Sequence, residues 1–120
     1  MSHQAGPVFA ALADPTRRRL VELLAGGKAN NATELAKALP ITRQGVSKHL
    51  AVLEHAGLIA GRQVGREKHY QFRPEPLEEP LEWITRITQQ WDQRLEKLRD
   101  YLREQDNAQA ENQEVKRLQE

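Results

Sequence analysis

The sequence of 120 residues contains no cysteine, which excludes disulfide bonds and thiolate metal sites. It contains no apolar run as long as a signal-peptide core or a membrane-spanning helix. Aromatic residues make up 5% and apolar residues 38% of the chain, so any core must be small. A chain of this size is expected to form one domain, and dimerisation would add buried area. We therefore expect a cytoplasmic protein with no membrane partner.

Charge is nearly balanced over the whole chain but is distributed unevenly along it. The 18 basic and 17 acidic residues give a net charge of +1. Residues 42–73 contain six basic and two acidic residues, a net of +4, whereas residues 74–120 contain seven and twelve, a net of −5. A basic block in a nearly neutral chain indicates a polyanionic partner for that block.

Four short helices are expected in the first half of the chain. Asp14, Asn31 and Thr42 are suited to cap the amides at three helix starts, and Gly or Pro follows each of these helices. The expected ranges are 7–14, 15–25, 32–39 and 43–56.

A hairpin and a long helix are expected in the second half. Two extended runs, Leu58–Gln63 and Lys68–Phe72, flank "VGRE", and apolar residues alternate with polar ones in the second run. The long helix runs from about Glu79 to about Asp106. Beyond that point its apolar spacing meets only polar residues, so a domain of residues 1–106 and a polar, disordered tail of residues 107–120 are predicted. Continuation of the helix through this segment, with nothing to bury, is the alternative.

The helix expected at residues 43–56 has one apolar side and one polar side. At about 100° per residue, Val46, Leu50 and Leu53 fall together, opposite Gln44 and Lys48. The polar side carries residue types that bond base edges or phosphates, and the preceding helix completes a helix-turn-helix motif that directs it into the major groove. The predicted DNA-contacting residues are Thr42, Arg43, Gln44, Ser47, Lys48 and His49. The helical wheel places His49 at the edge of this side, where partial burial is an equally good interpretation.

The hairpin that follows is basic, which is typical of the wing of a winged helix. Its predicted DNA contacts are Arg62, Arg66, Lys68 and His69. Such a wing follows phosphates or enters the minor groove, so double-stranded DNA is the predicted partner. Two alternatives remain: the polar side is merely solvated, or the winged helix is a protein-interaction module that binds an acidic partner.

Four stretches together resemble the ArsR family of bacterial repressors: "ALADPTRRRLVELL", "ITRQGVSKHLAVLEHAGLI", "GREKHYQF" and "WDQRLEKLRDYL". The resemblance covers roughly residues 6–103. It implies a mainly α winged helix-turn-helix fold with five helices and a β-hairpin wing. It also implies a homodimer built on the first and last helices that represses by occupying an operator. By the same resemblance, residues 43, 44, 47, 48 and 49 read the groove, with His49 turned to the DNA.

The last helix carries an apolar stripe that is longer than a small core can cover, which favours a dimer seam. Packing within its own chain, and a ligand pocket lined by Trp83 and Trp91, are the alternatives. The predicted interface residues, including those that the resemblance adds from the first helix, are Val8, Phe9, Leu12, Leu81, Ile84, Ile87, Trp91, Leu95 and Leu98.

No metal, cofactor or catalytic site is predicted. Where metal-sensing relatives often carry paired cysteines, this sequence has "ATELAKAL", and its last helix has no histidine. Of the histidines at positions 3, 49, 55 and 69, His49 and His55 lie about 240° apart on their helix and cannot share an ion. Ser47 and His49 diverge on the helix and no acid is placed to orient the histidine, so an enzyme is not expected. The effector is left open, and sensing of an unidentified ligand is an alternative.

Overall fold

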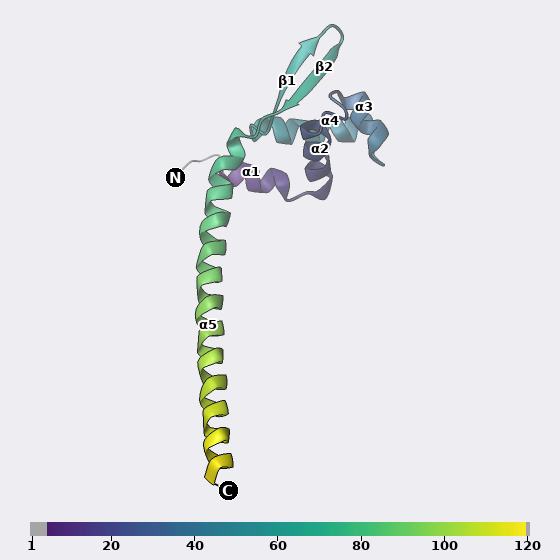
Figure 1. Ribbon diagram of the computed structural model, residues 1–120. Helices are drawn as coiled ribbons and strands as arrows, with labels where there is room; N and C mark the ends of the chain where they lie inside the picture. Colours follow the sequence, from purple (N-terminus) through teal and green to yellow (C-terminus); the bar gives the residue numbers. More distant parts are fainter. Residues whose placement is uncertain (1–4, 120) are drawn as a thin grey trace. The chain divides into compact units, whose positions relative to one another are not determined.

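The computed structural model describes residues 5–119. Within them, five α-helices and one antiparallel hairpin confirm the predicted winged helix-turn-helix fold class (Figure 1). The elements are α1 (Ala5–Leu12), α2 (Pro15–Ala25), α3 (Ala32–Ala38), α4 (Arg43–His55), β1 (Ile59–Val64), β2 (Glu67–Phe72), a 3₁₀ turn η1 (Glu75–Leu77) and α5 (Glu78–Gln119). The chain forms two compact units, one up to Glu82 and one from Trp83 onward, which are described separately.

The three predicted helix caps are confirmed. The Asp14 carboxylate accepts hydrogen bonds from the amides of Thr16 (2.8 Å) and Arg17 (3.1 Å). The Asn31 side chain accepts from the amide of residue 34 at 2.8 Å, and the Thr42 hydroxyl accepts from the amide of residue 45 at 3.0 Å. Because Asp14 has an extended backbone and starts α2, the first helix ends at Leu12, two residues earlier than predicted.

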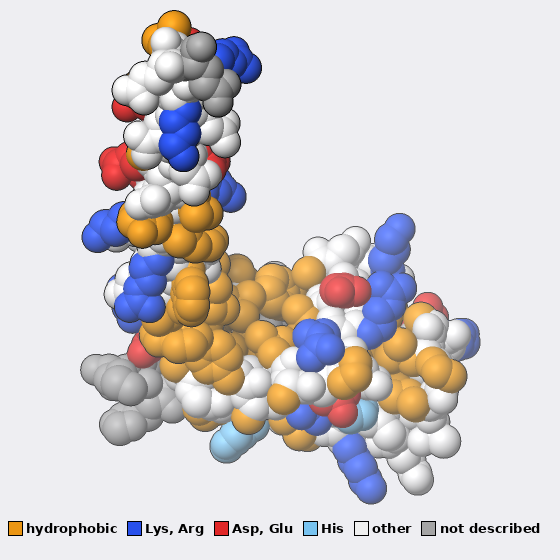
Figure 2. All heavy atoms as spheres, turned by 90° about the horizontal axis from the view of Figure 1, so that it is seen from below, with side chains coloured by type: hydrophobic (Ala, Val, Ile, Leu, Met, Phe, Trp, Pro, Cys, Tyr) orange, Lys and Arg blue, Asp and Glu red, His pale blue; other side chains and the backbone are white. Residues whose placement is uncertain are grey.

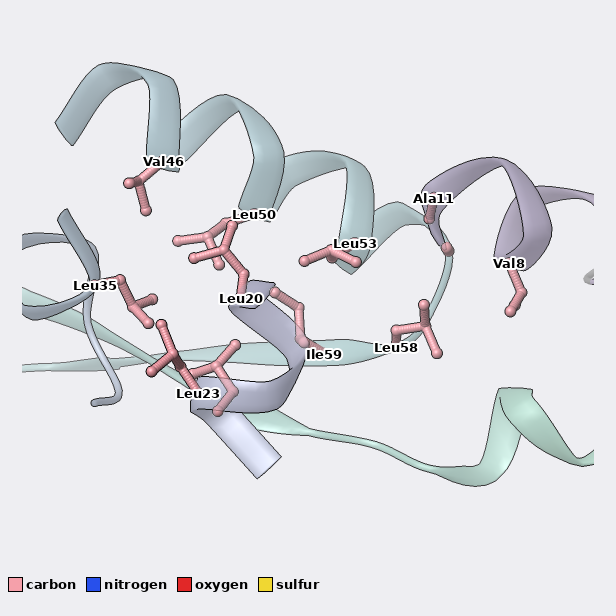
Figure 3. Close-up of a cluster of buried hydrophobic side chains, with 12 residues drawn as sticks. Val8, Ala11, Leu20, Leu23, Leu35, Val46, Leu50, Leu53, Leu58 and Ile59 are labelled. Atoms are coloured by element: carbon pink, nitrogen blue, oxygen red, sulfur yellow. The ribbon is translucent and has the colours of Figure 1, made fainter. Parts of the chain in front are cut away.

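The core lies beneath α4 and fixes which side of that helix faces outward. Figure 3 shows Val46, Leu50 and Leu53 of α4 directed at leucines from α2 and α3. These three side chains are fully buried, and burying an aliphatic side chain contributes about 1.5–3 kcal/mol to folding. The helix is therefore held along one side, and its opposite side is exposed.

In Figure 1 the hairpin projects away from α2, α3 and α4, which lie near its base. Its strands pair over six residues each and are joined by a turn of two residues, Gly65 and Arg66. The φ angle of Gly65 is +62°, a conformation that suits glycine at the first position of a type II′ turn. The amide of Tyr70 in β2 donates to the carbonyl of Asn30 at 2.7 Å, which ties the hairpin to the loop before α3.

The last helix is longer than predicted. α5 continues to Gln119, so residues 107–119 form an exposed helix instead of the predicted disordered tail. The prediction stopped near Asp106 because the apolar spacing ends there. The following residues nevertheless include Ala, Gln, Glu, Lys and Arg and no Gly or Pro, a composition that favours helix without burial. None of the helices in residues 5–119 is both long and apolar enough to cross a membrane.

Candidate nucleic-acid interface

The first two turns of α4 present a polar surface. Arg43, Gln44, Ser47 and Lys48 are exposed, and within residues 5–119 none of their side chains has a hydrogen-bonding or ion-pair partner. Ala51, one turn further along, is exposed and small. The side chains that the sequence predicts as groove contacts are thus brought together and are available to a ligand.

Thr42 differs from its neighbours because its hydroxyl oxygen is already used in the structure. It accepts the hydrogen bond that caps α4, and a Cβ added at Gly45 would lie 3.3 Å from that oxygen. A capping hydroxyl still has its own hydrogen to donate. Thr42 therefore starts the helix and can also donate to a phosphate.

His49 is half-buried and contacts Arg17 of α2. Arg17 Nη1 lies 3.4 Å from His49 Nδ1. Because a guanidinium only donates hydrogen bonds, Nδ1 must accept, which leaves the ring proton on Nε2. Arg17 also donates from Nε to the carbonyl of Ala11 (2.6 Å) and from Nη2 to that of Ala10 (3.1 Å). His49 is therefore held by the protein and keeps one donor for a ligand.

Asp14 belongs to the same group of polar residues. The hydrogen bond from the Arg17 amide lowers the pKa of the Asp14 carboxyl below its ordinary value, and the Thr16 amide lowers it further. The nearby positive charge of Arg17 acts in the same direction, as would that of His49 if its ring were protonated, while partial desolvation opposes them. The charged carboxylate is thus favoured at the start of α2, where it also complements the helix dipole.

The wing presents two arginines without partners. Arg62 in β1 and Arg66 in the turn are exposed, and within the described part of the chain neither side chain forms a hydrogen bond or an ion pair. Both cations are therefore available to phosphates.

The side chains of the other two predicted wing contacts, Lys68 and His69, are paired with carboxylates of the same chain. Lys68 Nζ lies 3.1 Å from Glu54 Oε1 on α4 and 5.3 Å from the centre of the Tyr70 ring. The hydrogen bond to Glu54 raises the pKa of Lys68, with the charges of Tyr70 and Glu54 adding to it. His69 Nε2 lies 3.1 Å from Glu67 Oε2.

Sequence reasoning did not identify Glu54 and Arg17 as residues of this surface. The sequence did contain one signal for Glu54. Glu54 and Glu67 are the only acidic residues in the basic block 42–73, and each pairs with a basic side chain of the wing. No local signal identified Arg17, because its partner on α4 is 32 residues away in sequence.

The predicted dimer residues lie on α1 and α5 and differ in how far they are exposed. On α5, Trp91, Leu95 and Leu98 are 58%, 45% and 53% exposed, and Figure 2 shows hydrophobic side chains gathered on one stretch of this helix. Leu81, Ile84, Ile87 and, on α1, Phe9 are also exposed. Leu12 is half-buried. Val8 was wrongly predicted, because its side chain is fully buried in the core of its own chain and has no surface to offer a partner.

The histidines and acidic residues of the described chain form neither a metal site nor a catalytic triad. Among residues 5–119, no three His, Asp or Glu side chains are grouped so as to hold a metal ion; His3 lies outside the described residues. The nearest polar partner of His49 is a guanidinium, whereas a catalytic histidine base is oriented by a carboxylate.

Comparison with known proteins agrees with this geometry. A family model described as a helix-turn-helix domain matches residues 12–62, which include α2, α3 and α4. The transcriptional repressor SdpR of Bacillus subtilis is 31% identical over 85 residues, or 71% of this chain and 93% of SdpR. The arsenic resistance transcriptional regulator ArsR1 of Pseudomonas putida is 33% identical over 87 residues, 70% of this chain and 68% of its own. The chain belongs to the ArsR family of transcriptional regulators.

A solved structure supports the same assignment. An ArsR-like transcriptional regulator from Rhodococcus sp. RHA1 is 37% identical, with a TM-score of 0.67, over 81% of this chain and 88% of its own. This ArsR-family protein is accordingly a DNA-binding regulator of transcription with a winged helix-turn-helix, and its relatives are regulators, not enzymes.

Proposed function

We propose that this ArsR-family regulator is a homodimeric, metal-independent repressor that binds a palindromic operator. In this proposal α4 enters the major groove of each half-site and the wing lies on the flanking backbone or in the minor groove. One observation carries the proposal. Within residues 5–119, the first two turns of α4 expose four polar side chains that have no partner, while the other side of the helix is buried in the core.

The exposed side chains have complementary roles at a groove. Gln44 suits bidentate bonding to adenine, Arg43 and Lys48 suit guanine edges or phosphates, and Ser47 suits either. His49 adds the Nε2 donor that its contact with Arg17 leaves free. In the wing, the two unpartnered arginines supply sequence-independent attraction to phosphates.

The homodimer is proposed from the surface of α5. Large apolar side chains recur along this helix at alternating steps of three and four residues, with Thr88 in one slot, which is the spacing of a helix–helix seam. Contiguous exposed apolar surface of this kind marks an interaction site. A two-fold dimer would place two copies of α4 on one face of the duplex, which is why a palindromic operator is expected.

Metal independence is proposed from the ligand types that the chain carries. Arsenite and soft metals favour thiolates, and this chain has no cysteine. The relative ArsR1 is named for arsenic resistance, so this chain would differ from it in what releases the operator. Sensing of another ligand remains the alternative for its regulation.

The test is a selection from random-sequence duplexes followed by affinity measurements over a range of salt concentrations. We expect an enriched sequence that binds at least about 10³-fold more tightly than a random duplex, with affinity falling steeply as salt rises. An absence of any enriched sequence, together with binding to an acidic peptide, would favour the protein-interaction module instead.

A further inference from the structure

Glu54, near the end of α4, holds both strands of the wing with one carboxylate. Oε2 accepts a hydrogen bond from the amide of Gly61 in β1 at 2.9 Å. Oε1 accepts one from Lys68 Nζ in β2 at 3.1 Å. Within residues 5–119, no other side chain of α4 forms a hydrogen bond or an ion pair with the hairpin.

The absence of a side chain at Gly61 makes room for this arrangement. A Cβ built at position 61 would lie 2.9 Å from Glu54 Oε2 and would clash with Cε of Lys68. The φ angle of Gly61 is not positive. A side chain at position 61 would therefore have to push aside the flexible ends of Lys68 and Glu54.

The lysine is fixed from a second direction as well. Its ammonium group lies over the ring of Tyr70, a partly buried residue that packs against the core. The Tyr70 amide is bonded to the carbonyl of Asn30, so this part of β2 is anchored to the helical unit. The ion pair thus joins α4 to an anchored part of the wing, whereas the residues from Arg62 to the tip are exposed.

We propose that Glu54 is a positioning residue that sets the wing at a fixed orientation to α4, and that Lys68 is its internal partner instead of a phosphate ligand. The proposal rests on the proposed DNA-binding mode. It assigns Glu54 the task of placing Arg62 and Arg66 at the distance from the groove-reading side chains that the operator requires.

If only charge matters, removing Glu54 should change DNA affinity in the direction opposite to the one that the proposal predicts. This difference makes the proposal testable. Glu54→Ala removes a negative charge and frees a lysine, so binding to any DNA should tighten if charge is all that matters. If Glu54 positions the wing, binding to the preferred duplex should weaken although the net charge has become more favourable.

The experiment uses the full chain with the duplex enriched by selection and a random duplex of equal length. For Glu54→Ala we expect about fivefold weaker binding to the selected duplex, the equivalent of about one lost hydrogen bond, and equal or tighter binding to the random duplex. Glu54→Gln can still accept from the Gly61 amide. Its affinity for the selected duplex should therefore lie between that of Glu54→Ala and that of the original protein. Glu22→Ala, which removes an exposed acid paired with Arg19 on α2, is the matched control and should leave the ratio of the two affinities unchanged.

A double-mutant cycle separates positioning from general stabilisation. Arg66→Ala should weaken binding in the original protein and have little effect in the Glu54→Ala background, because the wing is then already misplaced. Equal or tighter binding of Glu54→Ala to the selected duplex would overturn the proposal, as would a full Arg66→Ala effect in both backgrounds. If selection enriches no sequence with the original protein, the DNA-binding proposal itself fails, and that result is distinct from either of these.

Discussion

Arg17 Nη1 lies 3.4 Å from His49 Nδ1, so one guanidinium links α4 to the end of α1. Its other two nitrogens donate to the carbonyls of Ala10 and Ala11 in the last turn of α1. The helix that we propose reads DNA is thereby connected to the helix that carries Phe9, a proposed interface residue. Through Arg17, a change at the proposed dimer surface of α1 would reach His49.

We expect Arg17→Lys to lower the free energy of unfolding by about 1–2 kcal/mol, measured by urea denaturation. A lysine keeps the charge but lacks the fixed fork that reaches three acceptors at once. Arg19→Lys is the matched control. Among the described residues, the Arg19 side chain forms only an exposed ion pair with Glu22 at 3.0 Å, so its replacement should change stability by less than about 0.5 kcal/mol. Equal losses in the free energy of unfolding for Arg17→Lys and Arg19→Lys would show that the contacts of Arg17 do not stabilise the fold.

At the recognition surface, Gln44→Ala or Lys48→Ala should cost about 1–3 kcal/mol at the preferred site and relax the sequence preference there. Arg66→Ala should instead weaken binding to all duplexes evenly and reduce the salt slope by about one, as expected for a phosphate contact. Gel-shift titrations on the selected duplex and its single-base variants distinguish these effects. Unchanged affinity in all three variants would refute the assignment of α4 and the wing.

For assembly, Trp91→Glu or Leu95→Glu should convert the dimer into monomers in sedimentation velocity runs, because an unpaired charge in the seam costs several kcal/mol. Operator binding should weaken in parallel, since two half-sites need two linked copies of α4. Gln93→Glu adds the same charge elsewhere on the helix surface and should leave the dimer intact. A tight dimer in the Trp91 and Leu95 variants would contradict the proposed seam.

On regulation, we expect that zinc, copper, nickel, cadmium and arsenite do not release the regulator from the selected duplex. Release requires an effector that binds the free form better than the DNA-bound form, and the described residues offer no ligand set for a metal. The measurement is a fluorescence-anisotropy titration of the complex with each ion, with and without chelator. Stoichiometric release of the regulator from the duplex by one ion, abolished by replacing His49, His55 or His69, would contradict this expectation.

The helix starts and the buried side of α4 could be predicted because their signals are local. A capping residue acts on amides two or three positions away, and apolar spacing identifies a helical face without knowledge of what covers it. The same locality explains the failures. Apolar Val8 could be recognised as a packing residue, but only the assembled fold shows that its own core covers it.

The contacts that organise the candidate site could not be predicted in this way. Glu54 and Lys68 are 14 residues apart in sequence, and Arg17 and His49 are 32 apart. Each pair meets only after the hairpin or α2 has packed. The sequence therefore indicates a basic surface without showing which basic side chains already form ion pairs within the protein. Lys68 and His69 were consequently predicted as DNA contacts on the same grounds as Arg62 and Arg66.

The central claim, that two copies of α4 read successive major grooves of one operator, is tested most directly by methylation interference on the selected duplex. The account predicts that methylation of guanine N7 in the major groove blocks binding at two symmetric positions about 10 base pairs apart, on one face of the duplex. Interference that is absent from the major groove, or confined to a single half-site, would contradict it.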